Sequence, residues 1–467
     1  MKAYRAIATL NRGDRKHIER AFRFMEEIIR VFHSARVPLK NSPPFIVDIV
    51  KDMYLHLSSI VSHDVSVVLN NDYLKAFLIN FNHKAKDTLK AFRSNGIGNE
   101  GSAERKVVIK LSIIFSNMLF ELKEYFPDYV YVASAYRISK REAENFWKNH
   151  FPGKIYVSWE DFIKAANTMP NGPLDKTEME SFRQTVDIMG HDMVTTFEFD
   201  VFTRLFYPWS SILRNWRVIT ALHPAYAPTL TYDEVRQHLE KCSHMPGSYM
   251  YRLSCTRPGQ WAIGYVGQDH KIYQTIPQNK SLIIAVHEGN RDGFYKYPKG
   301  KRIANIDLGS LLEICPAERI KVPADEYDAY CEMGSSYEMC KICDDRNKNV
   351  RVEPCGHLLC SVCLANWQEA ENGNTCPFCR EEIKTTSLIM FVRETSSNFE
   401  EIPNDPVETA ICEEMDDTIE MNSHNGSAPD LIDMTENGLP LDIPIPPRLP
   451  ESGPPPLPPR THRRNRQ

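Results

Sequence analysis

The segment from Cys340 to Arg380 reads CKICDDRNKNVRVEPCGHLLCSVCLANWQEAENGNTCPFCR and contains seven of the chain's twelve cysteines together with one histidine. Thiolate and imidazole groups are the ligands that a structural zinc ion prefers, and four of them complete a tetrahedral site. Eight ligands therefore predict two zinc ions, whose binding supplies the folding free energy that so short a segment cannot obtain from a core of its own. The predicted ligands are Cys340, Cys343, Cys355, His357, Cys360, Cys363, Cys376 and Cys379.

The ligand spacing resembles that of the RING finger, although spacing by itself leaves other two-zinc modules open. The resemblance implies interleaved pairing, in which the first and third ligand pairs hold one ion while the second and fourth pairs hold the other. The implied sets are Cys340, Cys343, Cys360 and Cys363 on one zinc, and Cys355, His357, Cys376 and Cys379 on the other.

Apolar side chains lie between the ligands, and a domain of this size has no room to bury them, so they can form a docking patch. In RING ubiquitin ligases this patch holds the ubiquitin-conjugating enzyme. Arg380, just beyond the last ligand, is either a donor that bridges that enzyme and ubiquitin or a solvated surface cation. The residues predicted to dock the conjugating enzyme are Ile342, Trp367, Pro377, Phe378 and Arg380.

The composition of the whole chain limits the class of protein to which it can belong. At 467 residues it is long enough for several domains, and 42% hydrophobic and 25% charged residues are typical of soluble globular proteins. A net charge of −5 gives no general case for nucleic-acid binding. Cysteines outside the zinc segment show no pairing pattern, no signal peptide is recognisable, and no run of eighteen apolar residues occurs. We expect an intracellular protein, located in the cytoplasm or the nucleus.

Apolar residues recur at helical spacing in four stretches between residue 14 and about residue 126. The first stretch carries Ile18, Phe22 and Met25 and follows Asp14, a plausible helix cap. Four amphipathic helices joined by short polar loops predict a helix bundle over residues 1–135. Taken alone, these residues indicate a scaffold.

Shorter helices are expected over residues 136–207, around a twelve-residue loop that begins at Asp187 and ends at Glu198. Acidic residues at the first and last positions are the outline of an EF-hand calcium loop. The residues inside the loop depart from this outline, because the thioether of Met189 and the imidazole of His191 suit a hard cation poorly. A metal-free structural EF-hand and a calcium site both stay open. The calcium ligands would be Asp187, Met189, His191, Met193 and Glu198.

Over residues 208–312 the pattern changes to helix, strands and helix, with strands expected at 249–254, 260–266 and 271–276. Arg252 points inward in the first strand, where burying a guanidinium is costly unless an anion accompanies it. A guanidinium can grip two phosphate oxygens at once; the alternative is an exposed or ion-paired arginine. The string GSYMYRLSCT followed by QWAIGY resembles the phosphate pocket of an SH2 domain, and it implies phosphotyrosine binding by Arg252, Ser254, Cys255 and Thr256.

Helices, EF-hand, SH2-like strands and RING in this order resemble the Cbl family of ubiquitin ligases, in a short, invertebrate-like form. The resemblance covers roughly residues 14–393 and implies a multidomain α+β protein whose first three modules form one phosphotyrosine-binding unit. It also implies that a side chain larger than glycine is poorly tolerated at Gly264. The strings that carry it are NSPP, TTFEFDVFTRLFYPWSS, LTYDEV, PGSYMYRLSCTRPGQWAIGYV, QTIPQNK, YCEMGS and CKIC…EPCGHLLC…CPFCR.

Residues 313–339 join the binding unit to the RING at residues 340–380, and ADEYDAYCEM within this linker predicts a short helix. Tyr327 and Tyr330 lie on one face of that helix. They either merely pack or, as the family resemblance implies, Tyr330 is a regulatory phosphorylation site. Phosphorylation adds a charge of about −1.5 to −2, which a buried tyrosine cannot accommodate, so the modification would free the RING.

The tail, residues 394–467, is acidic and then proline-rich, and its composition predicts disorder. It ends in a PxxPxR pattern at Pro455–Arg460, which favours an SH3-domain adaptor over a mere spacer. The long family members carry tail tyrosines and a terminal ubiquitin-associated domain; this chain has no tyrosine after Tyr337, and we expect none of the corresponding contacts.

These features together predict a RING-type E3 ubiquitin ligase that binds phosphotyrosine on activated kinases or receptors and down-regulates their signalling. We expect two zinc ions, a ubiquitin-conjugating enzyme as partner, no nucleic acid, no catalytic nucleophile, and a cytoplasmic location with recruitment to activated receptors at the plasma membrane. The main alternative is a non-catalytic phosphotyrosine adaptor whose zinc module is structural. A zinc-dependent nucleic-acid binder is disfavoured by the acidic balance.

Overall fold

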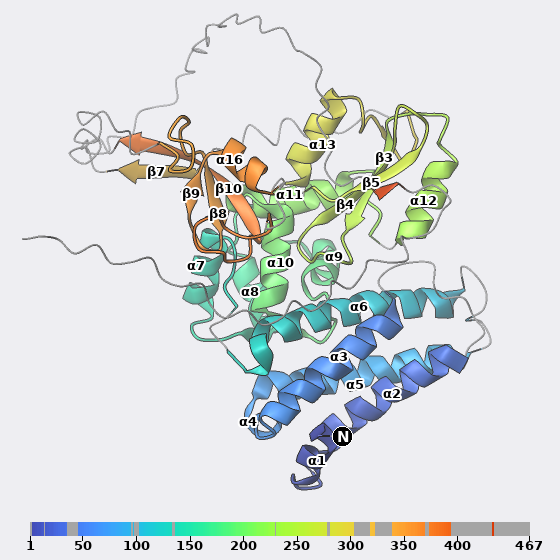
Figure 1. Ribbon diagram of the computed structural model, residues 1–467. Coiled ribbons are helices and arrows are strands. Elements are labelled where there is room, and N and C mark those ends of the chain that lie inside the picture. The colour runs from blue at the N-terminus through green and yellow to red at the C-terminus, as the bar shows by residue number, and fades with distance from the viewer. Residues whose placement is uncertain are drawn as a thin grey trace, which may run out of the picture. The chain divides into compact units, whose positions relative to one another are not determined.

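The computed structural model describes most of the chain up to residue 393 and two residues of the tail (Figure 1). Among the described helices, none combines the length and the apolar composition needed to cross a lipid bilayer. The predicted linker helix with Tyr327 and Tyr330, and the Pro455–Arg460 segment, lie outside the described residues. The described ranges are 2–13, 15–34, 45–94, 97, 102–132, 136–228, 230–277, 281–302, 318–322, 339–368, 373–393 and 432–433.

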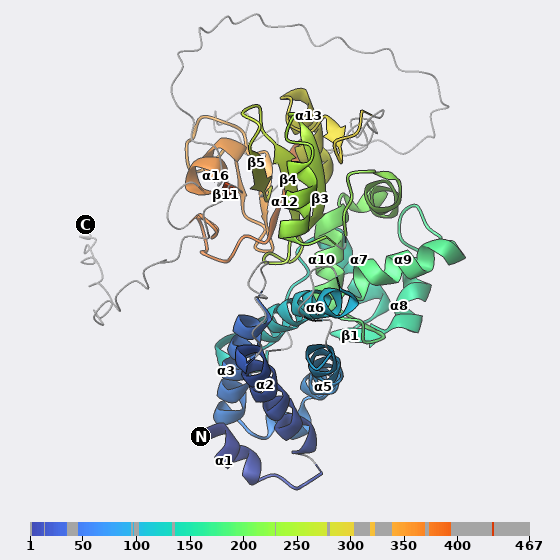
Figure 2. The ribbon, with the colours of Figure 1, turned by 90° about the vertical axis from the view of Figure 1, so that its right-hand side faces the viewer.

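The N-terminal part is the expected helix bundle, in which four long helices pack side by side (Figures 1 and 2). Asn71 caps one of them by accepting a hydrogen bond from the Leu74 N–H at 2.7 Å, and Ser102 caps another. Asp14, the predicted cap, is outside the described residues. The elements are α1 (Lys2–Ala8), α2 (Lys16–Ser34), α3 (Ile46–His63), α4 (Val67–Asn70), α5 (Asp72–Phe92), α6 (Ala103–Tyr125) and η2 (Pro127–Tyr129).

The next unit pairs two short strands between helices, as an EF-hand does. Ser158 caps α8 and Thr195 caps α10, each through its hydroxyl, and Val157 and Val194 lie opposite each other in the two-stranded sheet. The elements are α7 (Arg141–His150), β1 (Tyr156–Ser158), α8 (Trp159–Ala166), α9 (Lys176–Val186), β2 (Met193–Thr195) and α10 (Thr196–Phe206). A helical connection follows as η3 (Trp209–Ser211), α11 (Ile212–Trp216) and η4 (Arg217–Leu222).

A sheet with strand order β11-β5-β4-β3-β6 forms the third unit, and a helix covers each face (Figure 1). Helix α12 packs with Met250 and Val266 on one face, whereas α13 packs with the Tyr249 and Tyr251 side of β3. The elements are α12 (Tyr232–Glu240), β3 (Ser248–Leu253), β4 (Trp261–Val266), β5 (Ile272–Thr275), α13 (Leu282–Arg291), β6 (Tyr297–Pro298) and β11 (Ile432–Asp433). The three predicted strands are therefore present, each shifted by a residue or two.

The cysteine-rich unit contains a second sheet, of order β7-β10-β8-β9, over a small core that includes Val350, Val352 and Leu359. Strand β10 runs antiparallel to β8 and parallel to β7, which lies within the predicted linker, residues 313–339. The elements are β7 (Glu318–Val322), β8 (Val350–Glu353), β9 (Leu358–Leu359), α16 (Ser361–Gln368) and β10 (Thr385–Arg393). The folded finger thus continues past residue 380, where the sequence prediction ended it.

The tail contributes one element that its composition does not predict. Strand β11 pairs antiparallel with β5, in a segment for which the sequence predicts disorder throughout. Strand β5 would otherwise be the edge of its sheet, and an edge strand presents N–H and C=O groups that another strand can pair with. The prediction of a wholly unstructured tail is wrong at these two residues, because pairing of this kind depends on the sheet and not on the local sequence.

Candidate functional sites

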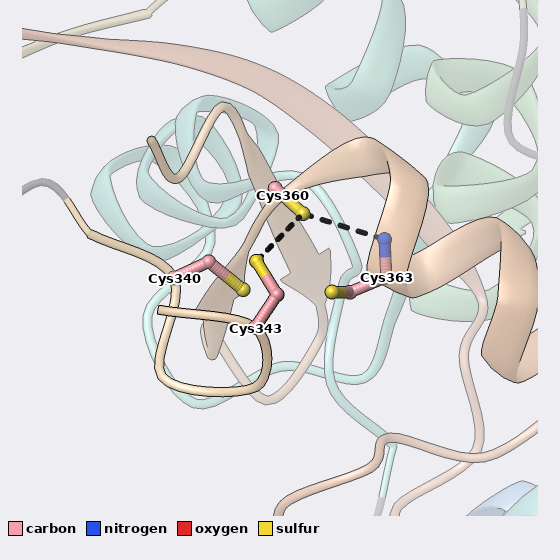
Figure 3. A group of neighbouring side chains, drawn as sticks. All are labelled: Cys340, Cys343, Cys360 and Cys363. Carbon is pink, nitrogen blue, oxygen red and sulfur yellow. Dashed lines mark hydrogen bonds between the residues drawn. The ribbon is translucent and has the colours of Figure 1, made fainter. Parts of the chain in front are cut away.

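The eight predicted zinc ligands form two separate groups of four. In one group the sulfur atoms of Cys340, Cys343, Cys360 and Cys363 all lie within 4.8 Å of one another, and Figure 3 shows them converging on a common centre. In the other group the ligand atoms of Cys355, His357, Cys376 and Cys379 meet the same limit. The first group joins the knuckle before β8 to the start of α16, so the fold of the finger brings the pairs together in the interleaved arrangement.

The chemistry of both groups suits zinc. Four sulfurs, or three sulfurs and one imidazole, are the donor sets of structural zinc sites. His357 Nδ1 is buried and has no hydrogen-bond partner among the described residues, although a buried ring nitrogen normally requires one. A metal ion bound at that nitrogen would supply the partner it lacks.

Among the predicted docking residues, Ile342 lies in the knuckle of the all-cysteine group, whereas Pro377 and Phe378 lie in the last knuckle of the cysteine–histidine group. Ile342 and Phe378 expose 46% and 42% of their surface, which is unusual for large apolar side chains that have a core nearby. Phe378 stacks on the His357 ring at 5.3 Å, and Trp367 donates from Nε1 to the Thr375 carbonyl at 2.6 Å. The zinc group and the neighbouring backbone therefore hold both aromatic rings in place.

Arg380 lies over one of these rings. Its guanidinium is 4.7 Å from the centre of the Trp367 ring, in the geometry of a cation–π contact. The side chain is exposed, and its backbone has a positive φ of 65°. Pro377 is half-buried between the last two cysteines. Trp367 and Arg380 thus form one continuous surface.

Arg252 is buried, with 6% of its surface exposed, on the face of the sheet that α12 covers. Its guanidinium donates to the Leu253 carbonyl at 3.2 Å and to Gln274 Oε1 at 3.3 Å, and it approaches the Cys255 sulfur at 3.8 Å. Its Nε has no partner, and no described residue places a carboxylate against it. A buried cation held only by neutral groups is energetically costly, and an incoming anion would remove that cost.

The loop after β3, which carries the Cys255 contact to this guanidinium, has hydrogen bonds of its own. Ser254 Oγ accepts from the Arg257 N–H at 3.1 Å and lies 3.5 Å from the hydroxyl of Thr256, which is exposed. The helix bundle braces the loop, because Ser116 on α6 donates to the Cys255 carbonyl at 3.2 Å. The bundle and the sheet therefore jointly position the backbone of the loop that follows Arg252.

Gly264 lies on the face of the sheet that α12 covers, which is also the face of Arg252. A Cβ atom at this position would lie 2.9 Å from Val235 Cγ1 and 3.1 Å from Leu239 Cδ1. Contacts this short force side chains or backbone to move. The absence of a side chain at Gly264 is what lets α12 approach the sheet beside Arg252.

The EF-hand-like loop brings Asp187, His191 and Glu198 together, with ligand atoms within 4.8 Å of one another. Calcium takes six to eight oxygen ligands. Of the three predicted ligands inside the loop, Met189 and His191 offer a thioether and an imidazole, which suit calcium poorly, and Met193 is not in the group. The donor set of the described residues does not fit a calcium ion, and no function is assigned to one.

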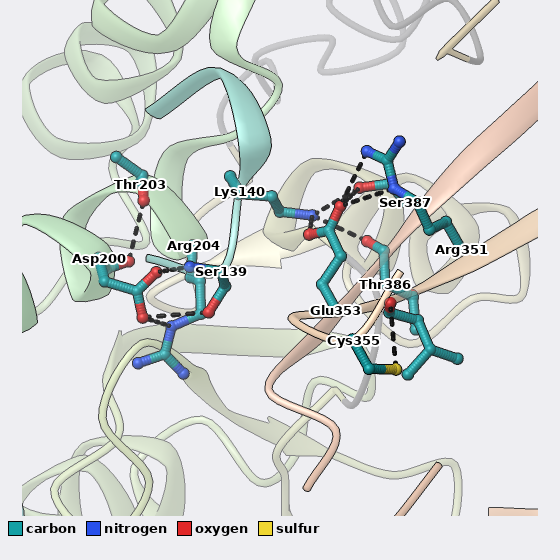
Figure 4. A network of polar contacts seen from close by, with 11 residues as sticks. Ser139, Lys140, Asp200, Thr203, Arg204, Arg351, Glu353, Cys355, Thr386 and Ser387 are labelled. Carbon is teal, nitrogen blue, oxygen red and sulfur yellow. Dashed lines mark hydrogen bonds and ion pairs between the residues drawn. The ribbon is translucent and has the colours of Figure 1, made fainter. Parts of the chain in front are cut away.

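A polar network joins the cysteine-rich unit to the EF-hand-like unit (Figure 4). Lys140 Nζ lies 3.2 Å from Glu353 Oε2 and donates to the Thr386 carbonyl at 2.9 Å, and both charged side chains are almost fully buried. Arg351 and Ser387 also donate to Glu353. A second ion pair joins Lys384 to Glu124 at 2.9 Å.

Sequence reasoning missed several residues that shape these sites. Gln274 touches Arg252 from β5, and Ser116 reaches the pocket loop from the helix bundle. Lys140 and Glu353 are ordinary surface residue types in the sequence. The alternation of β5 could have placed Gln274 on the Arg252 face, whereas nothing in the local sequence marks Ser116 or the Lys140–Glu353 pair.

The chain contains a helix bundle, an EF-hand-like unit, an SH2-like sheet with a buried arginine that has no acidic partner among the described residues, and a RING-type finger. This order of units defines a class of multidomain protein. Four family models match this chain in the same order. They are CBL proto-oncogene N-terminal domain 1 at residues 13–132, the EF hand-like domain at 136–220, the SH2-like domain at 222–308, and a C3HC4-type RING finger at 336–386.

Curated relatives of this chain point to the same family as the family models. The human E3 ubiquitin-protein ligase CBL-C is 43% identical over 322 residues, which cover 68% of this chain and 67% of the relative. The rat protein of the same name is 41% identical over 323 residues, covering 67% of this chain and 64% of the relative. A solved structure, described as an inactive choanoflagellate E3 ubiquitin ligase Cbl TKB, is 36% identical with a TM-score of 0.59 and covers 64% of this chain and 92% of that one. The chain belongs to the Cbl family. The matched segment spans about two thirds of each mammalian relative.

Proposed function

We propose that this protein is a phosphotyrosine-directed RING-type E3 ubiquitin ligase, which binds activated tyrosine kinases or receptors and down-regulates their signalling. The observation that carries the proposal is the buried guanidinium of Arg252, which has neutral neighbours and an unpartnered Nε. A phosphate group would satisfy it through paired charge-assisted hydrogen bonds, with Ser254 and Thr256 as further donors. Family membership supports the same assignment.

In this proposal the cysteine-rich unit binds two zinc ions and docks a ubiquitin-conjugating enzyme. Ile342, Trp367, Pro377 and Phe378 provide the apolar contact, and Arg380, positioned over Trp367, donates to the enzyme or to ubiquitin. The thioester belongs to the partner enzyme, and a lysine of the target attacks it. The ligase contributes orientation and a high effective concentration of the target, so it requires no nucleophile of its own.

The linker supplies regulation in the proposal. A cavity of about 620 Å³ is lined by Tyr207, Trp209 and Ile284 of the binding unit together with Val362 and Leu388 of the cysteine-rich unit. The linker precedes the cysteine-rich unit in the chain, and in this proposal an aromatic side chain such as that of Tyr330 would occupy the cavity. Phosphate on Tyr330 would be excluded from such walls, which would release the RING.

The remaining partners follow from the same function. Pro455–Arg460 would recruit an SH3-domain adaptor. The protein would act in the cytoplasm and reach the plasma membrane only through activated receptors.

Two assays test the proposal. Purified chain, ubiquitin, activating enzyme and several conjugating enzymes should give auto-ubiquitination, and Trp367→Ala should abolish it while the zinc content stays unchanged. A phosphotyrosine peptide library should yield ligands for the wild-type chain, and none of them should bind without the phosphate. Phosphopeptide binding without any ubiquitin transfer would favour a non-catalytic adaptor, and transfer without phosphopeptide binding would remove the targeting half of the proposal.

A further inference from the structure

The loop from Asp187 to Glu198 is closed by hydrogen bonds of its own. Asp187 Oδ1 accepts from the His191 N–H at 3.0 Å, and its Oδ2 accepts from the Asp192 N–H at 3.2 Å. Glu198 Oε1 accepts from the Met189 N–H at 2.9 Å, and its Oε2 accepts from the Thr195 N–H at 3.1 Å. Every carboxylate oxygen at the two ends of the loop is therefore already engaged by the protein.

The imidazole of His191 lies among the acidic groups of this loop. Its Nδ1 is 3.2 Å from Asp187 Oδ1, and its side chain is only 9% exposed. Burial by itself lowers the pKa of His191, but the charges of Glu198 and Glu121 and the hydrogen bond with Asp187 outweigh it and raise the pKa to about 9. The buried ring is therefore held by the carboxylate at the first position of the loop.

A third carboxylate reaches the same place from the helix bundle. Glu121, on α6, is 1% exposed and lines a small cavity together with His191, Met189 and Met193. Its Oε2 accepts from the Tyr73 hydroxyl at 2.9 Å, whereas its Oε1 has no hydrogen-bond partner among the described residues. The charge of Glu121 acts on His191, so this ring is electrostatically linked to the bundle as well as to the loop.

Two cations lie beside the loop. Arg183 Nε lies 3.7 Å from Asp187 Oδ2, and its guanidinium also pairs with Asp192. Lys84, on α5 of the bundle, donates to the Gly190 carbonyl at 3.0 Å. Cationic side chains from two helices, α9 and α5, thus supply positive charge beside the place where an EF-hand would hold a divalent ion.

We propose that His191 is a built-in replacement for a metal ion, which holds the EF-hand-like loop closed and ties it to the helix bundle through Glu121. The binding unit then assembles without calcium, and its stability does not respond to calcium concentration. This inference concerns only the loop and the bundle, and it is independent of whether Arg252 binds phosphate.

The test uses the full chain with its zinc retained, and it compares three proteins by thermal unfolding in calcium-free buffer without chelator and in calcium at about 1 mM, which saturates all but the weakest EF-hand loops. The wild type should melt at the same temperature in both. His191→Ala should melt several degrees lower in both, because the buried contact between the imidazole and Asp187 is lost and Asp187 keeps no side-chain partner inside the loop. Met189→Asp combined with His191→Asn restores oxygen ligands, so it should melt lower in the calcium-free buffer and recover in calcium.

Direct metal analysis keeps the test decisive if a variant fails to fold. After dialysis against calcium and zinc, the wild type should retain zinc in the cysteine-rich unit and no calcium. Stabilisation of the wild type by calcium, retained calcium, or an additional zinc that His191→Ala removes would each overturn the proposal. Unchanged melting of His191→Ala would overturn it as well.

Discussion

The SH2-like sheet and the cysteine-rich finger each present a functional surface, but they are held together by different forces. The sheet packs Tyr249, Tyr251 and Ile263 against α13 and the connection before β3, in a large continuous core. The finger has a handful of aliphatic side chains, such as Val352 and Leu359, around its cysteines. The sheet around Arg252 therefore rests on ordinary burial of apolar surface, whereas in our proposal the docking face of the finger depends on zinc.

The strongest test of this contrast is to remove the metal ligand Cys360 by Cys360→Ser. Structural zinc contributes about 10–16 kcal/mol to the folding of small metal-binding domains, far more than the small aliphatic core around Val352 can replace. Ubiquitin transfer should be abolished and the zinc content should fall. Phosphopeptide affinity, measured by calorimetry, should stay unchanged; if it fell in parallel, the two units would share one folding transition.

The substitution Arg252→Lys tests the SH2-like sheet, the other unit in this comparison. Lysine cannot hold two phosphate oxygens in a fork, so we expect a loss of about 3 kcal/mol, or roughly 100-fold in phosphopeptide affinity. Auto-ubiquitination should continue. Arg291→Lys is the matched control, because that arginine is 74% exposed at the end of α13. Equal affinity for both variants would show that Arg252 does not contact the phosphate.

A smaller effect is expected where α12 meets the sheet. Gly264→Val should destabilise the binding unit by about 2 kcal/mol, since the added side chain overlaps Val235 and Leu239. Phosphopeptide affinity should fall with it, while the zinc content stays constant. Gly13→Ala is the control, because nothing lies within 4 Å of a Cβ at Gly13. If both substitutions left the melting temperature unchanged, close packing at Gly264 would be irrelevant to the pocket.

The core of the binding unit should also have an acid sensitivity of its own. Burial lowers the pKa of His223 to about 4, and its Nδ1 accepts from the Ala225 N–H at 3.2 Å. The unfolded chain takes up this proton near pH 6.5, so stability is complete above that pH and declines as the pH falls toward 4.

At pH 5 the loss from His223 should be about 2 kcal/mol. Denaturant unfolding at pH 7 and pH 5 measures it, with His223→Gln as the comparison. The variant should lose less stability than the wild type over this interval. An identical loss in both proteins would mean that other groups account for the acid sensitivity.

Local patterns predicted much of the architecture. Helical periodicity in the first 126 residues, alternation around Arg252 and the cysteine spacing each depend on neighbours in the chain, so the unit types and their order were predictable. Strand β10 was missed because it lies beyond the last ligand, and β11 because two residues carry no periodic signal. The outline of an EF-hand was predictable from the acids at both ends of the loop. The sequence did not decide between a calcium site and a metal-free structural loop.

By itself the sequence determined which side chains are available: eight zinc-type ligands at knuckle spacing, an arginine within a strand, and a loop with acids at both ends. Only the tertiary structure decided what surrounds them. Gln274 rather than a carboxylate lies against Arg252, and Glu121 and Lys84 reach the Asp187 loop from helices far away in the chain. The reason is that the cost of burying a charge depends on every group nearby, and packing between units, not sequence spacing, chooses those groups.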